Sequence, residues 1–172
     1  PDPKRHPHAF YAGLRLVAID GSNFEVADEP DTATTFGYPG SRTGHAAYPQ
    51  AQCAVLVECA SHAILGANLG AYRTAEWAIC EPLLSHVNAD MLLLADRGFN
   101  GYHHWRAASA TGAQLLWRCA ANRQLPVVRL LPDGSSLSAI YPDPKSRRSR
   151  EGELALRVIE YSLPNKTGEP VR

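Results

Sequence analysis

Two apolar runs of the chain each stop at an aspartate, and these two positions constrain the fold and the chemistry most. Residues 14–19 precede Asp20, and residues 91–95 precede Asp96. Short apolar runs of this kind predict β-strands. In α/β sheets the carboxyl ends of strands form the crevice where ligands bind, so acids placed there converge if the strands are neighbours. The sequence therefore predicts two carboxylates at strand ends, in an arrangement suited to a divalent metal ion.

Glycine follows each aspartate closely, as Gly21 after Asp20 and Gly98 after Asp96. A residue without a side chain leaves the backbone open beside the acid. We expect this open space to admit a bulky ligand next to the two carboxylates.

Composition is that of an ordinary globular domain. The chain has 172 residues, of which 45% are hydrophobic and 20% charged, enough to bury a core of its own. It contains no run of roughly 20 apolar residues that could cross a bilayer, and the Pro- and His-rich start lacks the apolar stretch of a signal peptide. A cytoplasmic location without membrane contact is expected. The missing initiator Met and the abrupt start predict that the chain is a piece of a longer protein.

Four cysteines lie far apart without a CxxC pair, so neither a disulfide framework nor a zinc ribbon is indicated. Cys53, Cys59 and His62 could be pictured as zinc ligands, but they flank an apolar run and have no fourth partner. The cysteines are interpreted as buried thiols in a reducing compartment.

The charge is unevenly distributed although the formal net charge is zero. Residues 1–90 hold 5 Lys and Arg against 10 Asp and Glu, and residues 91–172 hold 12 against 7. The basic residues are densest at Lys145, Arg147, Arg148 and Arg150. Such a cluster suits phosphate groups, and a solvated loop is the alternative interpretation.

The order of predicted elements favours one fold class. We expect strands over 14–19, 52–60 and 63–69, a helix over 75–86, a strand over 91–95, a helix over 102–111 and a strand over 114–119. Thr74 is the expected N-cap of the first helix, and residues 25–48 are expected to form a long polar loop. No GxGxxG or GxxxxGK loop is present, so no nucleotide cofactor is expected.

An α/β fold with a three-strand meander followed by helix, strand, helix and strand fits the ribonuclease H-like arrangement. In that mixed sheet the first and fourth strands lie side by side and parallel, which would bring Asp20 and Asp96 together. Beyond residue 124 the chain becomes β-rich, with strands expected over 127–131, 136–141 and 154–161. The predicted domains are therefore an α/β unit at 1–123 and a β-rich segment at 124–172. A resemblance to a known family, carried by the motifs below, further implies that 1–123 is the first part of a ribonuclease H-like core, that 124–172 is a β-rich insertion, and that the C-terminal part of the core is absent.

Several phrases of the chain resemble bacterial insertion-sequence transposases of the DDE type, in the branch whose catalytic domain is interrupted by a β-strand insertion. They are Val17-Ala18-Ile19-Asp20-Gly21-Ser22, Leu94-Ala95-Asp96-Arg97-Gly98-Phe99 with Tyr102 after it, Leu116-Trp117-Arg118, and the β-rich stretch after 124. Either short motif alone is a weak match. The two in order, each at a predicted strand end, are a fairly specific combination.

The resemblance implies metal-dependent cleavage and strand transfer of DNA, with Asp20 and Asp96 as the first two acids of a catalytic triad. It further implies two Mg²⁺ or Mn²⁺ ions in the complete enzyme, DNA as the partner, and a possible homodimer acting on paired transposon ends. The third acid of the family is a Glu in a Tyr-x2-Arg-x3-Glu-x6-Lys pattern. That pattern is absent from this sequence, so no Glu of the chain is assigned to it and the fragment alone is expected to be inactive.

Alternative interpretations remain open for several residues. Arg97, Arg118 and Arg123 could contact DNA phosphates or could be ordinary solvated arginines. Three tryptophans, Trp77, Trp105 and Trp117, are expected in the core rather than stacked on bases. A stand-alone nuclease with the same metal site, and a truncated transposase remnant that at most binds DNA, are the alternative functions.

Overall fold

The computed structural model describes residues 2–41, 44–120, 123–161, 163–164 and 170–171. It divides into two compact units, Pro1–Arg118 and Cys119–Arg172. Within the described residues, none of the helices has the length and apolar character required to span a bilayer.

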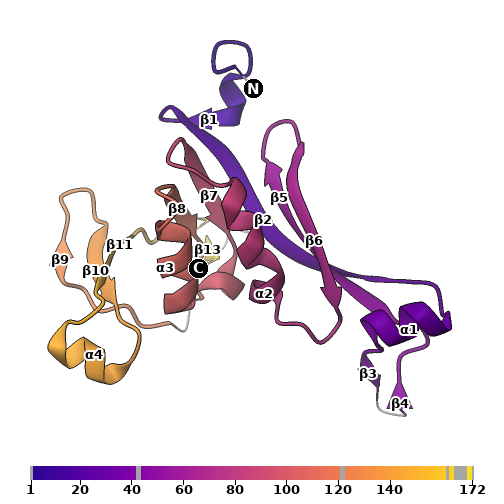
Figure 1. Ribbon diagram of the computed structural model, residues 1–172. Helices are drawn as coiled ribbons and strands as arrows, with labels where there is room; N and C mark the ends of the chain where they lie inside the picture. The colour runs from indigo at the N-terminus through magenta and orange to yellow at the C-terminus, as the bar shows by residue number, and fades with distance from the viewer. Residues whose placement is uncertain (1, 42–43, 121–122, 162, 165–169, 172) are drawn as a thin grey trace. The chain divides into compact units, whose positions relative to one another are not determined.

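The first unit contains one main sheet and the helices that pack on it (Figure 1). In chain order its elements are η1 (Pro7–Ala9), β1 (Phe10–Tyr11), β2 (Leu14–Glu25), α1 (Pro30–Phe36), β3 (Gly40–Ser41), β4 (Gly44–His45), β5 (Gln50–Glu58), β6 (Ile64–Ala71), α2 (Glu76–Cys80), η2 (Glu81–His86), β7 (Met91–Ala95), η3 (Arg97–Phe99), α3 (Tyr102–Ser109) and β8 (Gln114–Trp117). The elements labelled η are 3-10 helices.

The sheet has the strand order β6-β5-β2-β7-β8, with β1 paired to β2. β5 pairs antiparallel with both β2 and β6, so the predicted three-strand meander is confirmed. β7 runs parallel to β2 on one side and to β8 on the other. The expected adjacency of the first and fourth predicted strands is therefore confirmed, and the fold is a mixed α/β fold.

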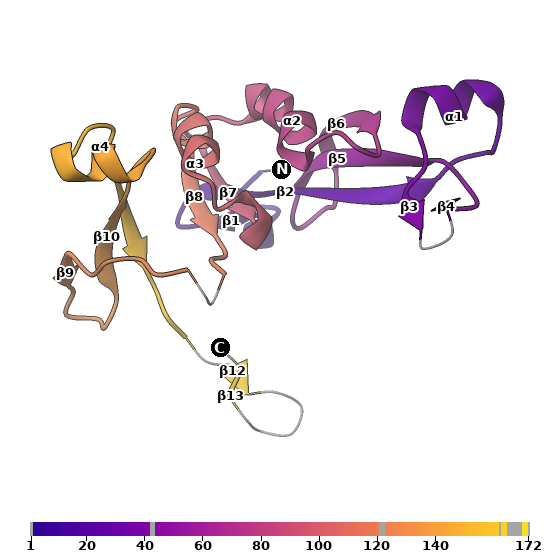
Figure 2. The same cartoon turned by 90° about the horizontal axis from the view of Figure 1, so that it is seen from below.

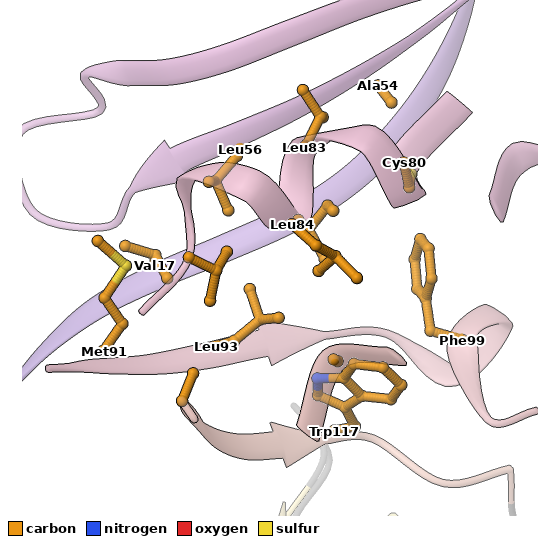
Figure 3. Close-up of a cluster of buried hydrophobic side chains, with 14 of the residues drawn as sticks. Val17, Ala54, Leu56, Cys80, Leu83, Leu84, Met91, Leu93, Phe99 and Trp117 are labelled. Atoms are coloured by element: carbon orange, nitrogen blue, oxygen red, sulfur yellow. The ribbon is translucent and has the colours of Figure 1, made fainter. Parts of the chain in front are cut away.

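Side chains of α2, η2 and α3 cover one face of this sheet and form the core with it (Figures 2 and 3). Leu56 on β5 and Leu93 on β7 are fully buried, and Leu84 of η2 packs in the same cluster. Phe99 packs edge-on against Trp77 and Trp117, with ring centroids 6.0 and 6.3 Å away. The tryptophans thus belong to the core, as expected. Each large apolar side chain removed from water in this way contributes about 2 kcal/mol.

Strand β2 is longer than the sequence predicts. The prediction ended it at residue 19, but the strand continues to Glu25 because β5 stays paired with it through Glu25 and Gln50. The additional residues are polar and largely exposed, so backbone pairing rather than apolar patterning extends the strand. Asp20 consequently lies inside a strand, opposite Val55, and the prediction that it ends a strand is wrong.

Helix α1 and the helical segment formed by α2 and η2 also differ from the prediction. The expected polar loop at 25–48 contains α1, which starts with a capping box between Glu29 and Thr32, and the short β3–β4 hairpin. The helix predicted over 75–86 is an α-helix only to Cys80 and continues as the 3-10 helix η2. Its N-cap is Ala75 rather than Thr74.

The second unit contains a three-stranded antiparallel sheet in the order β11-β10-β9 and a further two-stranded pair (Figure 1). Its elements are β9 (Arg129–Leu130), β10 (Ser136–Ile140), α4 (Pro144–Ser149), β11 (Leu154–Val158), β12 (Leu163–Pro164) and β13 (Pro170–Val171). The strands expected over 127–131, 136–141 and 154–161 are present as the shorter strands β9, β10 and β11. The basic segment expected as a loop is the helix α4, which Asp143 caps by accepting hydrogen bonds from the backbone N–H groups of Lys145 and Ser146.

Candidate metal centre

The register of the parallel pair β2–β7 places the two predicted aspartates at the same level of the sheet. The last paired residues are Ala18 and Leu94. Asp20 follows two residues later within β2, and Asp96 follows two residues later, one residue past the end of β7. Both side chains are exposed, so solvent and ligands can reach them. The structure therefore brings together two acids that are distant in sequence.

Backbone N–H groups hold each carboxylate locally. The N–H of Gly98 donates to Asp96 Oδ1 over 2.6 Å, which makes Asp96 the N-cap of η3. The N–H of Gly21 donates to Asp20 Oδ1 over 2.9 Å. In each acid the other carboxylate oxygen remains available to a ligand.

Asn100 fixes the turn that follows Asp96. Its Nδ2 donates to the backbone carbonyls of Arg97 and Arg118, over 3.0 and 2.9 Å, and its side chain is buried. One amide thus joins the chain after β7 to the chain after β8. Arg97 and Arg118 are exposed and belong to the same unit as the two aspartates, whereas Arg123 lies in the second unit.

Sequence reasoning missed a third acid at this site. It is Glu76, the first residue of α2, a position where an acid commonly complements the helix dipole. In the structure, burial and the nearby carboxylates of Asp20 and Asp96 raise the pKa of Glu76. Such an effect of like charges on Glu76 indicates that its carboxyl group lies near the two aspartates. The only sequence signal was that α2 starts shortly before the strand that carries Asp96.

The acidic groups lack basic partners in the described part of the chain. Ion pairs there join Arg5 to Asp2, Arg150 to Glu153 and Arg157 to Asp133, and none of them involves these three acids. Within the same residues no set of three His, Cys, Asp or Glu side chains is already gathered to hold a metal ion. The repulsion among the acids therefore remains uncompensated by a side chain.

A small cleft of about 110 Å³ adjoins the first aspartate. Its lining residues are Asp20, Gly21, Ser22, Cys53 and Val55. The space is large enough for a few water molecules but not for an organic cofactor.

Cys80 lies just beneath this acidic region and is completely buried. Burial, together with the carboxylates of Glu76 and Asp20, raises the pKa of Cys80 to about 12 from an ordinary 9.0. Below the pKa, the thiolate population falls about tenfold for each unit by which the pKa is raised. Because the thiolate is the nucleophile, Cys80 should react slowly.

We expect Cys80 to resist iodoacetamide at pH 8 while the exposed Cys119 is alkylated. Peptide mass spectrometry after timed labelling measures both residues in one sample. Labelling in denaturant, where both thiols should react, is the control. Equal labelling of the two cysteines in the native protein would contradict the burial of Cys80.

Comparison with known proteins finds two similar sequences, and both are described as transposases. Over 165 residues it is 27% identical to the transposase InsG for insertion sequence element IS4 of Escherichia coli K12, covering 93% of this chain and 37% of InsG. Over 88 residues it is 31% identical to the putative transposase InsZ of the same strain, covering 51% of this chain and 29% of InsZ. The chain is homologous to bacterial transposases.

This similarity agrees with the resemblance to insertion-sequence transposases found in the motifs. The chain spans 37% of InsG and 29% of InsZ, well under half of either relative. No protein-family model matches it.

Proposed function

We propose that this chain forms part of a ribonuclease H-like catalytic domain of a DNA transposase, in which Asp20 and Asp96 bind the divalent cations of phosphoryl transfer. The observation that supports the proposal is the β2–β7 register, which sets Asp20 in β2 level with Asp96 just after the parallel neighbour β7. Homology to transposases supplies the reaction class. Metal-dependent DNA strand cleavage and strand transfer are thus the activity that the arrangement supports best.

The donor groups fit Mg²⁺ or Mn²⁺. Both side chains offer carboxylate oxygens, the hard ligands that these ions prefer. When bound, a pair of such ions neutralises charge on a phosphodiester and activates an attacking water or hydroxyl. In the proposed arrangement Asp20 and Asp96 hold the ions, and Asn100 keeps the loop of Asp96 in place.

DNA is the proposed partner, contacted at its phosphates near the acidic centre. Arg97 and Arg118 are exposed and emerge from two segments that Asn100 joins, so their guanidinium groups are available for phosphate contacts. Arg123 is proposed to contact DNA from the second unit. A homodimer on paired transposon ends belongs to the same proposal.

The test is strand cleavage by the natural full-length gene product on DNA that carries the ends of the element. We expect nicks only when Mg²⁺ or Mn²⁺ is present, and no cleavage in EDTA. Cleavage that persists in EDTA would overturn the metal proposal. DNA binding without cleavage under every metal condition would instead favour a non-catalytic remnant.

A further inference from the structure

Helix α4 of the second unit presents a basic cluster that the proposed metal centre does not use. The helix connects β10 to β11, beyond the last pair of that hairpin, Ile140 and Leu154 (Figure 2). None of its residues is buried. A hairpin connection needs only a few residues in a tight turn, so a solvated helix in this place is not explained by the packing of the second unit.

Three cations of α4 lack carboxylate partners in the described part of the chain. Lys145, Arg147 and Arg148 are exposed, and the ion pairs found there involve none of them. Arg150 differs, because it pairs with Glu153 just after the helix. The charge of the three cations is therefore directed to solvent.

The acids near α4 compensate this charge only in part. Asp143 accepts hydrogen bonds from two backbone N–H groups and a hydroxyl at the start of the helix, and the exposed Glu151 at the other end offsets one charge. Residues 119–172 hold 9 Lys and Arg against 6 Asp and Glu, a net charge of +3, whereas residues 1–118 hold 8 against 11, a net charge of −3. The basic character thus belongs to the second unit.

A groove of about 340 Å³ adjoins the helix within the same unit. Arg147 of α4 lines it together with Arg123, which precedes β9. Leu125, Ile140 and Pro142 contribute apolar lining. Two arginines from separate segments therefore border one opening, whose volume is sufficient for a phosphate and the sugar attached to it.

The composition of α4 distinguishes between two kinds of polyanion. Helices that bind a membrane surface carry Trp, Phe or Leu on the face opposite their cations. The sequence Pro-Lys-Ser-Arg-Arg-Ser of α4 contains no such side chain, so it has nothing to insert among acyl chains. A nucleic-acid backbone requires only cations that neutralise phosphates and release counterions, and arginine also offers paired hydrogen bonds to phosphate.

We infer that α4 and the adjoining groove form a contact surface for the phosphate backbone of DNA. Its cations are Lys145, Arg147, Arg148 and Arg123. The inference rests on the proposed function for its partner, but it does not depend on the metal centre. Phosphate contacts position a duplex without reading its sequence. Binding at this surface should therefore be independent of sequence, sensitive to salt and unaffected by EDTA.

The experiment is fluorescence anisotropy of a labelled DNA duplex of arbitrary sequence, titrated in EDTA with the 172-residue chain. Arg147→Gln/Arg148→Gln removes two positive charges from α4. Lys4→Gln/Arg5→Gln removes two from exposed residues of the first unit and is the matched control.

We expect the α4 variant to bind DNA at least about tenfold more weakly than the wild type at about 0.1 M salt, because fewer counterions are released. The logarithm of its binding constant should also depend less steeply on the logarithm of the salt concentration, with a slope smaller by about 2, or about 1 for each lost phosphate contact. The control variant should keep the wild-type slope.

A conservative variant separates charge from structure. Arg147→Lys/Arg148→Lys keeps both charges, and lysine binds phosphate as a point charge, so it should retain the wild-type slope and most of the affinity. The substituted residues are exposed and α4 has no buried residue. Circular dichroism of the glutamine variant should therefore match that of the wild type.

The outcomes separate this inference from the proposed function. Wild-type affinity and slope in Arg147→Gln/Arg148→Gln, or an equal loss in Lys4→Gln/Arg5→Gln, would overturn the inference and leave the metal proposal intact. Phosphatidylserine vesicles that bind the wild type but not the α4 variant, with equal DNA affinity in both, would overturn it in favour of a membrane. No DNA binding by the wild type would overturn both this surface and DNA as the partner. Failure of metal-dependent cleavage alone would overturn the proposed catalysis and leave this surface in place.

Discussion

Asparagine in place of Asp20 or of Asp96 is expected to reduce metal-dependent DNA cleavage by the full-length protein at least about 100-fold, because removal of a direct ligand should exceed the cost of removing a supporting residue. The substitution keeps the size of each side chain and the oxygen that accepts the local backbone N–H. The loss should therefore come from cation binding and not from misfolding. Asp90→Asn, at the exposed residue just before the opposite end of β7, is the control and should retain full activity.

The same variants have an opposite expected effect on stability. Each removes one negative charge from a group of acids without basic partners, so without divalent ions the variants should unfold no earlier than the wild type. Mg²⁺ at about 100 times its Kd would add about 2.7 kcal/mol to the wild type alone. Thermal unfolding with Mg²⁺ and with EDTA measures this difference. Equal stabilisation of wild type, Asp20→Asn and Asp96→Asn by Mg²⁺ would exclude these acids as ligands.

The central strands could be predicted from local pattern because burial on both faces leaves an apolar signature. Residues 91–95 carry no polar side chain, and β7 has those bounds in the structure. The apolar run at 52–60 likewise predicts β5, which extends from Gln50 to Glu58 in the structure. The antiparallel pairing of β5 with β6 follows from their short connection, whereas the adjacency of β2 and β7 rests on the ribonuclease H-like order of elements. That order of elements is sufficient to predict that Asp20 and Asp96 lie on neighbouring segments of the sheet.

Helices α1 and α4, which hydrophobic periodicity does not predict, carry another local sequence signal. Both α1 and α4 start with an acid at the N-cap followed by proline, Glu29-Pro30 and Asp143-Pro144. Proline is favoured at the first helical position, and an acid before it satisfies free backbone N–H groups. Neither helix has a buried residue. Their lack of an apolar face explains why a search for hydrophobic periodicity passed over them.

The approach of Glu76 to the aspartates could not be predicted from the sequence. It depends on how far α2 lies above β2, which is set by core packing of Ile79 and Cys80 against the sheet. An acid in the first turn of a helix has a common local explanation, so the residue type carried no distinguishing signal. Gly21 was noticed, but whether its open space faces solvent or another side chain is decided only by tertiary structure.

Glu58→Ala is expected to lower the free energy of unfolding by about 2–3 kcal/mol, because it removes the charged acceptor of three hydrogen bonds that hold the β5–β6 turn. The Glu58 carboxylate is fully buried. It accepts hydrogen bonds from the backbone N–H groups of Ala60 and Ser61, each over 2.9 Å, and from the Ser61 hydroxyl. Urea unfolding measures the loss. Glu25→Ala, at an exposed residue of β2, should change stability by less than about 0.5 kcal/mol.

The same carboxylate makes the stability of the protein depend on acid. Burial acts to raise the pKa of Glu58, but the Ser61 hydroxyl, the N–H groups of Ala60 and Ser61 and the Arg15 guanidinium outweigh it and hold the pKa at about 2, below the ordinary 4.5. A pKa lowered by folding contributes stability that is complete above the unfolded value and is lost as pH falls toward the folded one. The wild type should therefore lose stability between about pH 4.5 and pH 2 relative to Glu58→Gln, which has no proton to gain. Parallel stability curves for the two proteins across this range would show that Glu58 is not held as a carboxylate by the turn.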